Sequence, residues 1–124
     1  MAEPPDLYTI EIEPEVRAWL EKLARADYRA VERSADRLAT DGPALPFPLA
    51  SHLGDGVREL RIGAFRVTYW LAPGRRAVLL TVFRKTRMRE ADEVLRAQRA
   101  KKLCEAEHPP AGEYDVYSRN EEVQ

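Results

Sequence analysis

The sequence predicts an α+β fold, in which a mostly antiparallel sheet carries helices and the elements follow the order β-α-α-β-β-β-α. Three observations support this order. An alternating apolar stretch opens the chain, two stretches with helical spacing follow, and three short alternating stretches joined by tight turns occupy 57–84. A length of 124 residues suits one domain with a single core.

The first strand is predicted at 7–13, where Tyr8, Ile10 and Ile12 share one face. Pro14 ends this strand and suits the first turn of a helix, because the N–H that proline lacks has no helical partner there.

Two amphipathic helices are predicted next. The first has apolar residues at the i, i+3, i+4, i+7 spacing: Val16, Trp19, Leu20 and Leu23. The second is predicted at 27–39, with Asp27 as its N-cap and Gly42 and Pro43 as its stop. Its apolar face holds Tyr28, Val31, Ala35 and Leu38.

Residues 42–56 hold three prolines and three glycines and are predicted to be an irregular connector. Strands are predicted at 57–63, 65–72 and 77–84, with Pro73-Gly74 forming the last hairpin turn. A basic helix is predicted at 88–106. The acidic stretch that follows has no periodicity, so we expect a domain over 1–107 and a flexible acidic tail over 108–124.

Two helices after the first strand can cover one face of the sheet, and we expect the other face to be free. Alternation then assigns side chains to the two faces. Those expected on the covered face include Leu60, Ile62, Phe65, Val67, Tyr69, Leu71, Leu80 and Val82. Those expected on the free face are Glu59, Arg61, Arg66, Thr68, Trp70, Thr81, Phe83 and Lys85. Arg61, Arg66 and Lys85 are therefore expected to gather on one uncovered surface.

The net charge of −1 conceals a segregated chain. Residues 1–55 carry 6 Lys/Arg against 11 Asp/Glu, residues 56–102 carry 13 against 4, and residues 103–124 carry 1 against 6. The net charges are −5, +9 and −5. A basic middle segment is typical of a protein that binds a polyanion, and a solvated charged surface is the alternative.

Composition also excludes some classes of protein. The one cysteine, Cys104, excludes an internal disulfide framework and a multi-cysteine zinc site. No apolar run has the length of a membrane span, and the first residues do not resemble a signal peptide, so we expect a cytoplasmic protein with no membrane partner. No cofactor is predicted.

Arginines arranged around a phosphodiester could stabilise the charge that develops when an RNA chain is cut by its own 2′-hydroxyl. His52 is the predicted proton carrier near such a site, because His108 lies in the predicted tail. The alternatives are that His52 is polar surface and that the arginines form ion pairs, for example Arg61 with Glu59.

The runs LGDGVRELRI, FRVTYW and VLLTVFRKT resemble the RelE/ParE/HigB toxin superfamily, in particular its phage-derived HigB-like branch, over about residues 7–103. The resemblance implies a small RelE-like fold and a toxin of a type II toxin–antitoxin system. Most such toxins are ribosome-dependent mRNA endoribonucleases that inhibit translation. The implied partners are mRNA, the ribosome and an antitoxin, often of the helix-turn-helix type, while homo-oligomerisation stays open.

The resemblance implies that Arg66 binds the phosphate, with Arg61, Lys85 and His52 as the other catalytic candidates. The RNA-binding candidates are Arg84, Arg87, Arg58, Arg96 and Arg99. The RelE branch has lysines where Val57 and Glu59 stand here, and an aromatic proton carrier where Met88 and Arg89 stand, so its proton-transfer scheme does not carry over. Two alternatives stay open: a ParE-like toxin that inhibits DNA gyrase, and an inactive homologue that only binds the antitoxin.

Overall fold

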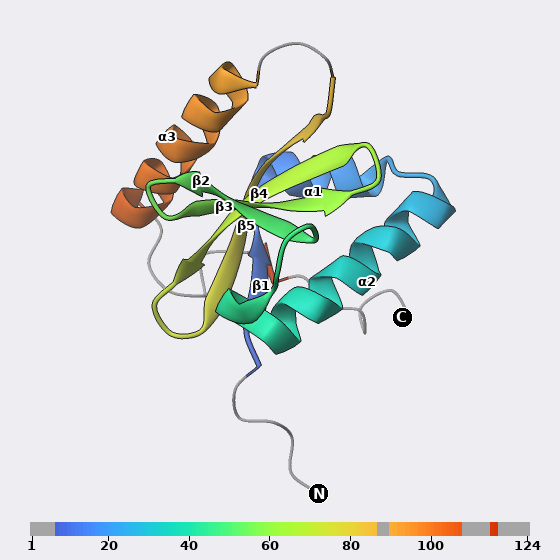
Figure 1. The fold of residues 1–124 in the computed structure, drawn as a ribbon, viewed down its shortest axis with the longest axis horizontal. Coiled ribbons are helices and arrows are strands. Elements are labelled where there is room, and N and C mark those ends of the chain that lie inside the picture. The colour runs from blue at the N-terminus through green and yellow to red at the C-terminus, as the bar shows by residue number, and fades with distance from the viewer. Residues whose placement is uncertain (1–6, 87–89, 108–114, 117–124) are drawn as a thin grey trace, which may run out of the picture.

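The computed structural model describes residues 7–86, 90–107 and 115–116. Its elements form an α+β fold in the predicted order, with two additional short strands (Figure 1). They are β1 (Thr9–Ile12), α1 (Pro14–Glu21), α2 (Arg25–Asp41), the 3-10 turn η1 (Gly42–Ala44), β2 (Ala50–Gly54), β3 (Val57–Ile62), β4 (Phe65–Ala72), β5 (Arg76–Arg84), α3 (Ala91–Glu107) and β6 (Asp115–Val116). The predicted fold class is confirmed.

The strands form one sheet in the order β2-β3-β4-β5-β1-β6. Strands β2 to β5 are consecutive antiparallel neighbours, whereas β1 pairs with β5 in parallel. The chain therefore leaves β1, passes through α1 and α2, enters the far edge of the sheet at β2 and returns strand by strand. The tight turn at Pro73-Gly74 joins β4 to β5 as predicted.

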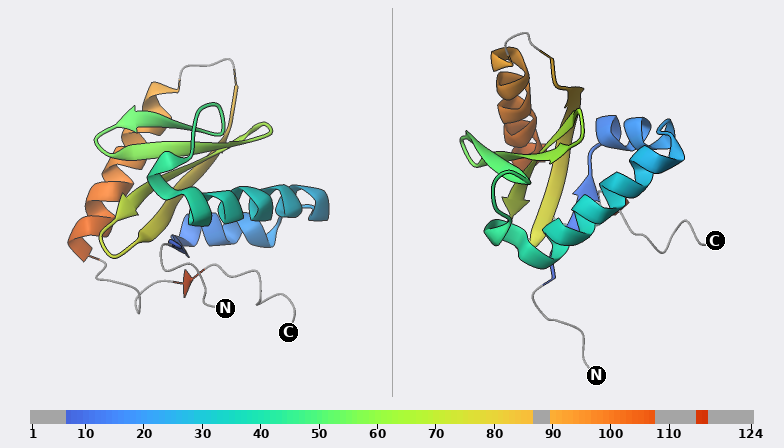
Figure 2. Two further views of the ribbon diagram at one scale, coloured as in Figure 1. Left: turned by 60° about the horizontal axis from the view of Figure 1, so that its bottom comes forward. Right: turned by 45° about the vertical axis from the view of Figure 1, so that its right-hand side comes forward.

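Helices α1 and α2 cover one face of the sheet, which we call the α1/α2 face (Figure 2). Their apolar stripes behave as the helical spacing predicts, and both Val16 and Leu38 are fully buried against the strands. Full burial of one such aliphatic side chain contributes about 1.5–3 kcal/mol. Helix α2 begins at Arg25 with Ala24 as its N-cap, so the prediction of Asp27 as the cap is wrong. Asp27 instead lies in the first turn, where its charge interacts favourably with the helix dipole.

The opposite face is not free, contrary to prediction, because α3 packs against it (Figures 1 and 2). We call it the α3 face. A second core lies beneath the helix: Trp70, Ala72, Val78, Leu80 and Cys104, with Ala100 at its edge. The Nζ atom of Lys101 also lies 4.9 Å from the centre of the Trp70 ring. Sequence alternation identified Trp70 as facing away from the first core, but did not predict that a helix covers it.

A β-bulge in β5 changes the predicted facing of its side chains. Thr68 of β4 is opposite Thr81, whereas the next residue, Tyr69, is opposite Leu79, so Leu80 is the extra residue. Leu80 consequently packs in the second core, while Val82 packs against the first. The prediction that these two residues share a face is wrong, because a bulge interrupts the period of two.

The predicted connector at 42–56 contains regular structure, so this prediction is also wrong. It holds η1 and the edge strand β2, which pairs with β3. Within the predicted tail, β6 pairs with the outer edge of β1, and the rest of 108–124 lies outside the described residues. None of the helices in the described ranges is both long enough and apolar enough to cross a bilayer.

Candidate functional site

Two arginines lie side by side at one end of the α3 face. Arg61 of β3 and Arg66 of β4 are directly opposite each other in the antiparallel register. Directly opposite residues project from the same face of a sheet, and alternation places both away from the first core. The structure thus brings together these two predicted site residues, and the tight turn at Gly63–Ala64 joins their strands.

Arg66 is held against this turn and only 8% of it is exposed. Its Nη1 atom donates hydrogen bonds to the carbonyl oxygens of Gly63 and Phe65, both at 2.9 Å. We find no other hydrogen bond of this guanidinium within the described parts of the chain. A guanidinium fixed at one edge is pre-organised to present its remaining N–H groups to an anion.

Lys85 reaches the same turn from β5. Its backbone N–H donates to the carbonyl oxygen of Ala64 at 2.7 Å, which extends the β4–β5 end of the sheet by one residue. Its ammonium lies 2.9 Å from Oε2 of Glu90 and is about half exposed. Lys85 is therefore near the paired arginines in the fold, but a carboxylate already partners its charge.

Arg61 differs from Arg66 in being partly exposed. Its guanidinium carbon lies 5.2 Å from the centre of the Phe47 ring, in the segment between η1 and β2. Phe47 itself is 69% exposed. The face of an aromatic ring attracts a cation, so Phe47 orients Arg61 without neutralising it. The ion pair considered between Arg61 and Glu59 is not seen among the described residues.

His52 does not lie beside the paired arginines, which corrects the sequence-based expectation. It is exposed on β2 and directly opposite Arg58. Arg58 is two residues from the buried Leu60 on the same strand, so both lie on the α1/α2 face. Arg58 donates to the carbonyl oxygen of Pro43 at 3.2 Å on that side. The period of two along β2 and β3 therefore turns both His52 and Arg58 to the opposite side of the sheet.

The remaining RNA-binding candidates do not join the pair either. Arg84 lies over the ring of Phe65, with its guanidinium carbon 4.8 Å from the ring centre, on the α1/α2 face. Arg99 is exposed on α3, and Arg87 lies outside the described residues.

Arg96 is a structural link between α3 and the rest of the molecule. It donates to carboxylate oxygens of Glu15 and Glu93 and to the carbonyl oxygen of Val82. The hydrogen bond to Glu15 is the main cause of a raised pKa of Arg96. Because Glu15 also accepts a hydrogen bond from the Val82 N–H, this cluster ties α1, β5 and α3 together.

Two polar residues on the same face as the paired arginines, Glu59 and Ser51, have no site role predicted from the sequence. Glu59 is only 7% exposed, and Ser51 Oγ donates to its Oε2 at 3.1 Å. Ser51 and Thr68 are its direct neighbours in β2 and β4. Alternation did place Glu59 on the same face as Arg61, but its burial depends on β2, which the sequence pattern did not predict.

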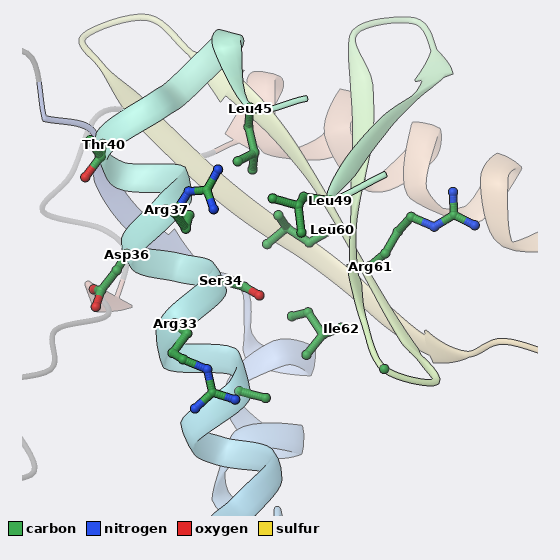
Figure 3. A pocket seen from close by; sticks show the side chains of 12 residues that line it. Arg33, Ser34, Asp36, Arg37, Thr40, Leu45, Leu49, Leu60, Arg61 and Ile62 are labelled. Atoms are coloured by element: carbon green, nitrogen blue, oxygen red, sulfur yellow. The ribbon is translucent and has the colours of Figure 1, made fainter. Parts of the chain in front are cut away.

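An open groove lies between α2 and β3 (Figure 3). It is on the α1/α2 face of the sheet, opposite the face that carries the arginine pair. Its volume is about 690 Å³. Apolar side chains form part of its lining: Leu45, Leu49, Leu60 and Ile62. Polar side chains of α2, together with Arg61 and Gly63, complete it, so this groove is suited to an amphipathic segment rather than to a compact polar ligand.

A metal centre built from clustered ligands is not seen in the described ranges, where no three His, Cys, Asp or Glu side chains come together. The chemistry available at the α3 face is therefore that of guanidinium groups, an ammonium, a carboxylate and hydroxyls. Such groups can bind a phosphodiester and transfer protons.

The comparisons with solved structures identify the fold. The chain is similar to RelE in the archaeal RelE–RelB complex from Pyrococcus horikoshii, with 23% identity, a TM-score of 0.57, and coverage of 66% of this chain and 99% of that one. The toxin–antitoxin complex RelBE2 from Mycobacterium tuberculosis matches with 24% identity, a TM-score of 0.51, and coverage of 64% and 99%. The isolated RelE toxin of E. coli matches with 11% identity, a TM-score of 0.51, and coverage of 72% and 96%.

A search of curated protein sequences found no match. A family model, in contrast, matches residues 18–102, which include the end of α1, all of α2, the paired arginines and most of α3. Because this match spans well over half of the sequence, the chain belongs to the phage-derived Gp49-like protein family (DUF891), and its fold is that of the RelE toxins.

Proposed function

We propose that this protein is the toxin of a type II toxin–antitoxin module and cleaves mRNA on the translating ribosome. The observation that carries the proposal is the pairing of Arg61 and Arg66 on one sheet face, with Lys85 bound at the same turn. Membership of the Gp49-like family and the RelE fold support it.

In the proposed reaction the ribose 2′-oxygen attacks the adjacent phosphorus. The bond between phosphorus and the 5′-oxygen breaks, which leaves a 2′,3′-cyclic phosphate and a 5′-hydroxyl end. Negative charge grows on the non-bridging phosphoryl oxygens, and Arg66 is the group best prepared to stabilise it because its guanidinium is already fixed. Loss of one pre-organised donor of this kind typically costs about 3–4 kcal/mol of barrier.

The proposed protein partner is a cognate antitoxin. Two of the similar solved structures are a RelE–RelB complex and a toxin–antitoxin complex. The groove between α2 and β3 supports such a partner, because its apolar floor and polar rim suit an amphipathic helix better than they suit RNA.

Expression of the wild type and of Arg66→Ala, followed by mapping of transcript 5′ ends, tests this proposal. The wild type should arrest growth and generate new ends inside translated reading frames. With purified translating ribosomes, Arg66→Ala should lower the cleavage rate by about 10²–10³-fold. Arg66→Lys should recover only a small part, because an ammonium cannot reproduce the fixed guanidinium fork.

Arg29→Ala is the matched control, since Arg29 is exposed on α2 and its loss removes the same charge. It should cleave like the wild type, and melting curves should show that both Arg66 variants are folded. Growth arrest with intact transcripts, together with inhibition of DNA supercoiling by the purified protein, would refute the nuclease proposal and favour the gyrase alternative.

A further inference from the structure

We infer that Glu59 is the group that accepts the proton of the attacking 2′-hydroxyl, with Ser51 as its positioning residue. This inference rests on the proposed nuclease function and adds to it a residue without an assigned role. It starts from the arrangement of side chains in two neighbouring rows across the α3 face.

The first row consists of polar side chains that are directly opposite one another in four successive strands: Ser51, Glu59, Thr68 and Thr81. The second row lies two residues closer to the β3–β4 turn: Arg61, Arg66 and Phe83. Glu59 is thus two positions from Arg61 on its own strand and diagonal to Arg66. Such diagonal positions are about 7–8 Å apart, which long side chains can span.

The carboxylate of Glu59 has one hydrogen-bonding partner among the residues that the structure describes. Ser51 donates to Oε2, whereas the hydroxyl of Thr68 lies 2.6 Å from that of Thr81 and is engaged there. Within the described residues Glu59 has no ion pair, and its Oε1 atom has no hydrogen bond. A buried carboxylate with a single hydrogen bond is costly for stability, so a purely structural role explains it poorly.

The charged residues at neighbouring positions on this face are Arg61 on β3, Arg66 on β4 and Lys101 on α3, whose Nζ atom lies over the ring of Trp70. Strand β2 contributes the uncharged Ser51, and α3 contributes Gln98, whose amide donates to the carbonyl oxygen of Leu53 nearby. A phosphodiester bound by the two arginines would therefore have Glu59 as its neighbouring proton acceptor. His52 projects from the other face of the sheet and cannot take this place.

The step is balanced without a further reactant. The carboxylate of Glu59 takes the proton of the 2′-hydroxyl, and the 2′-oxygen forms its bond to phosphorus. The bond from phosphorus to the 5′-oxygen breaks, its electron pair stays on the 5′-oxygen, and solvent water supplies the proton for that oxygen. Transfer of the first proton from Glu59 back to water restores the protein.

Single-turnover cleavage of a ribosome-bound mRNA over a range of pH tests this inference with Glu59→Gln. Glutamine keeps the shape and the hydrogen bond from Ser51 but cannot accept the proton. The rate should fall by about 10²–10⁴-fold, and the decline of the rate toward low pH should disappear. Affinity for the same complex with a 2′-deoxy nucleotide at the cleavage position should stay within about threefold, because the lost interaction belongs to the transition state.

Ser51→Ala provides a second test, which does not depend on whether Glu59→Gln folds correctly. The charged carboxylate loses its hydrogen bond, so the decline at low pH should begin at a higher pH while the maximal rate is largely kept. Glu32→Gln, a half-buried change on α2, is the control and should match the wild type. If Glu59→Gln cleaves at the wild-type rate, or if neither variant changes the pH profile, the inference is wrong although the nuclease function stands. If the wild type does not cleave, both fail.

Discussion

The second core under α3 can be tested by truncating Leu80. This side chain is 1% exposed and packs with Trp70, Val78 and Cys104. Leucine-to-alanine changes in a packed core cost about 2–5 kcal/mol, through lost burial and the cavity left behind. Total stabilities are about 5–15 kcal/mol, and a domain of this size loses roughly 3–6 °C in melting temperature per kcal/mol. We therefore expect Leu80→Ala to lower the melting temperature by roughly 6–30 °C.

Urea unfolding followed by far-ultraviolet circular dichroism gives the free energy of unfolding directly. The control is Leu103→Ala, the same substitution on α3 at a side chain that is 54% exposed. It should change the free energy of unfolding by no more than about 0.5 kcal/mol. If Leu80→Ala costs no more than this control, then α3 does not cover the sheet, and the bulge assignment in β5 is refuted as well.

Two further predictions concern the first core. Gly42→Ala should be more destabilising than Gly63→Ala. Both residues have positive φ, which costs alanine about 1–2 kcal/mol, but only at Gly42 would the new Cβ collide with the Tyr8 ring. Equal losses in melting temperature would contradict this prediction. Burial raises the pKa of Tyr69, and the charge of Arg58 partly opposes the rise. The folded state therefore keeps a proton that the unfolded chain loses, and stability should fall as the pH rises above the ordinary value of 10.0. Tyr69→Phe should remove this part of the alkaline decline, and an identical decline in both proteins would be evidence against it.

Much of the local structure follows from patterns that act over a few residues. The spacing of Val16 and Leu20 predicts which side of α1 is buried, because 3.6 residues complete one helical turn. The alternation in β3 and β4, across a tight turn, places Arg61 opposite Arg66. Both results depend on backbone periods and turn length alone, which neighbouring residues determine.

The position of His52 shows where such patterns stop being sufficient. Its facing depends on the pairing of β2 with β3, and the prolines and glycines around β2 conceal a strand whose order comes from that partner. The burial of Glu59 has the same origin, since Ser51 on β2 supplies its hydrogen bond. Residues at a sheet edge gain their structure from pairing more than from their own propensity.

The sequence by itself determined the α+β class, the two helices of the first core and the same-face arrangement of Arg61 and Arg66. Only the tertiary structure decided that α3 covers the second face, that Leu80 and Val82 face opposite ways, that His52 lies on the other face from the arginines and that Glu59 is buried. The physical reason is the distance along the chain over which each kind of interaction acts. Helical and strand periods are set within a few residues, whereas a thinly apolar helix, a bulge and an edge strand are stabilised by contacts between segments far apart in the chain.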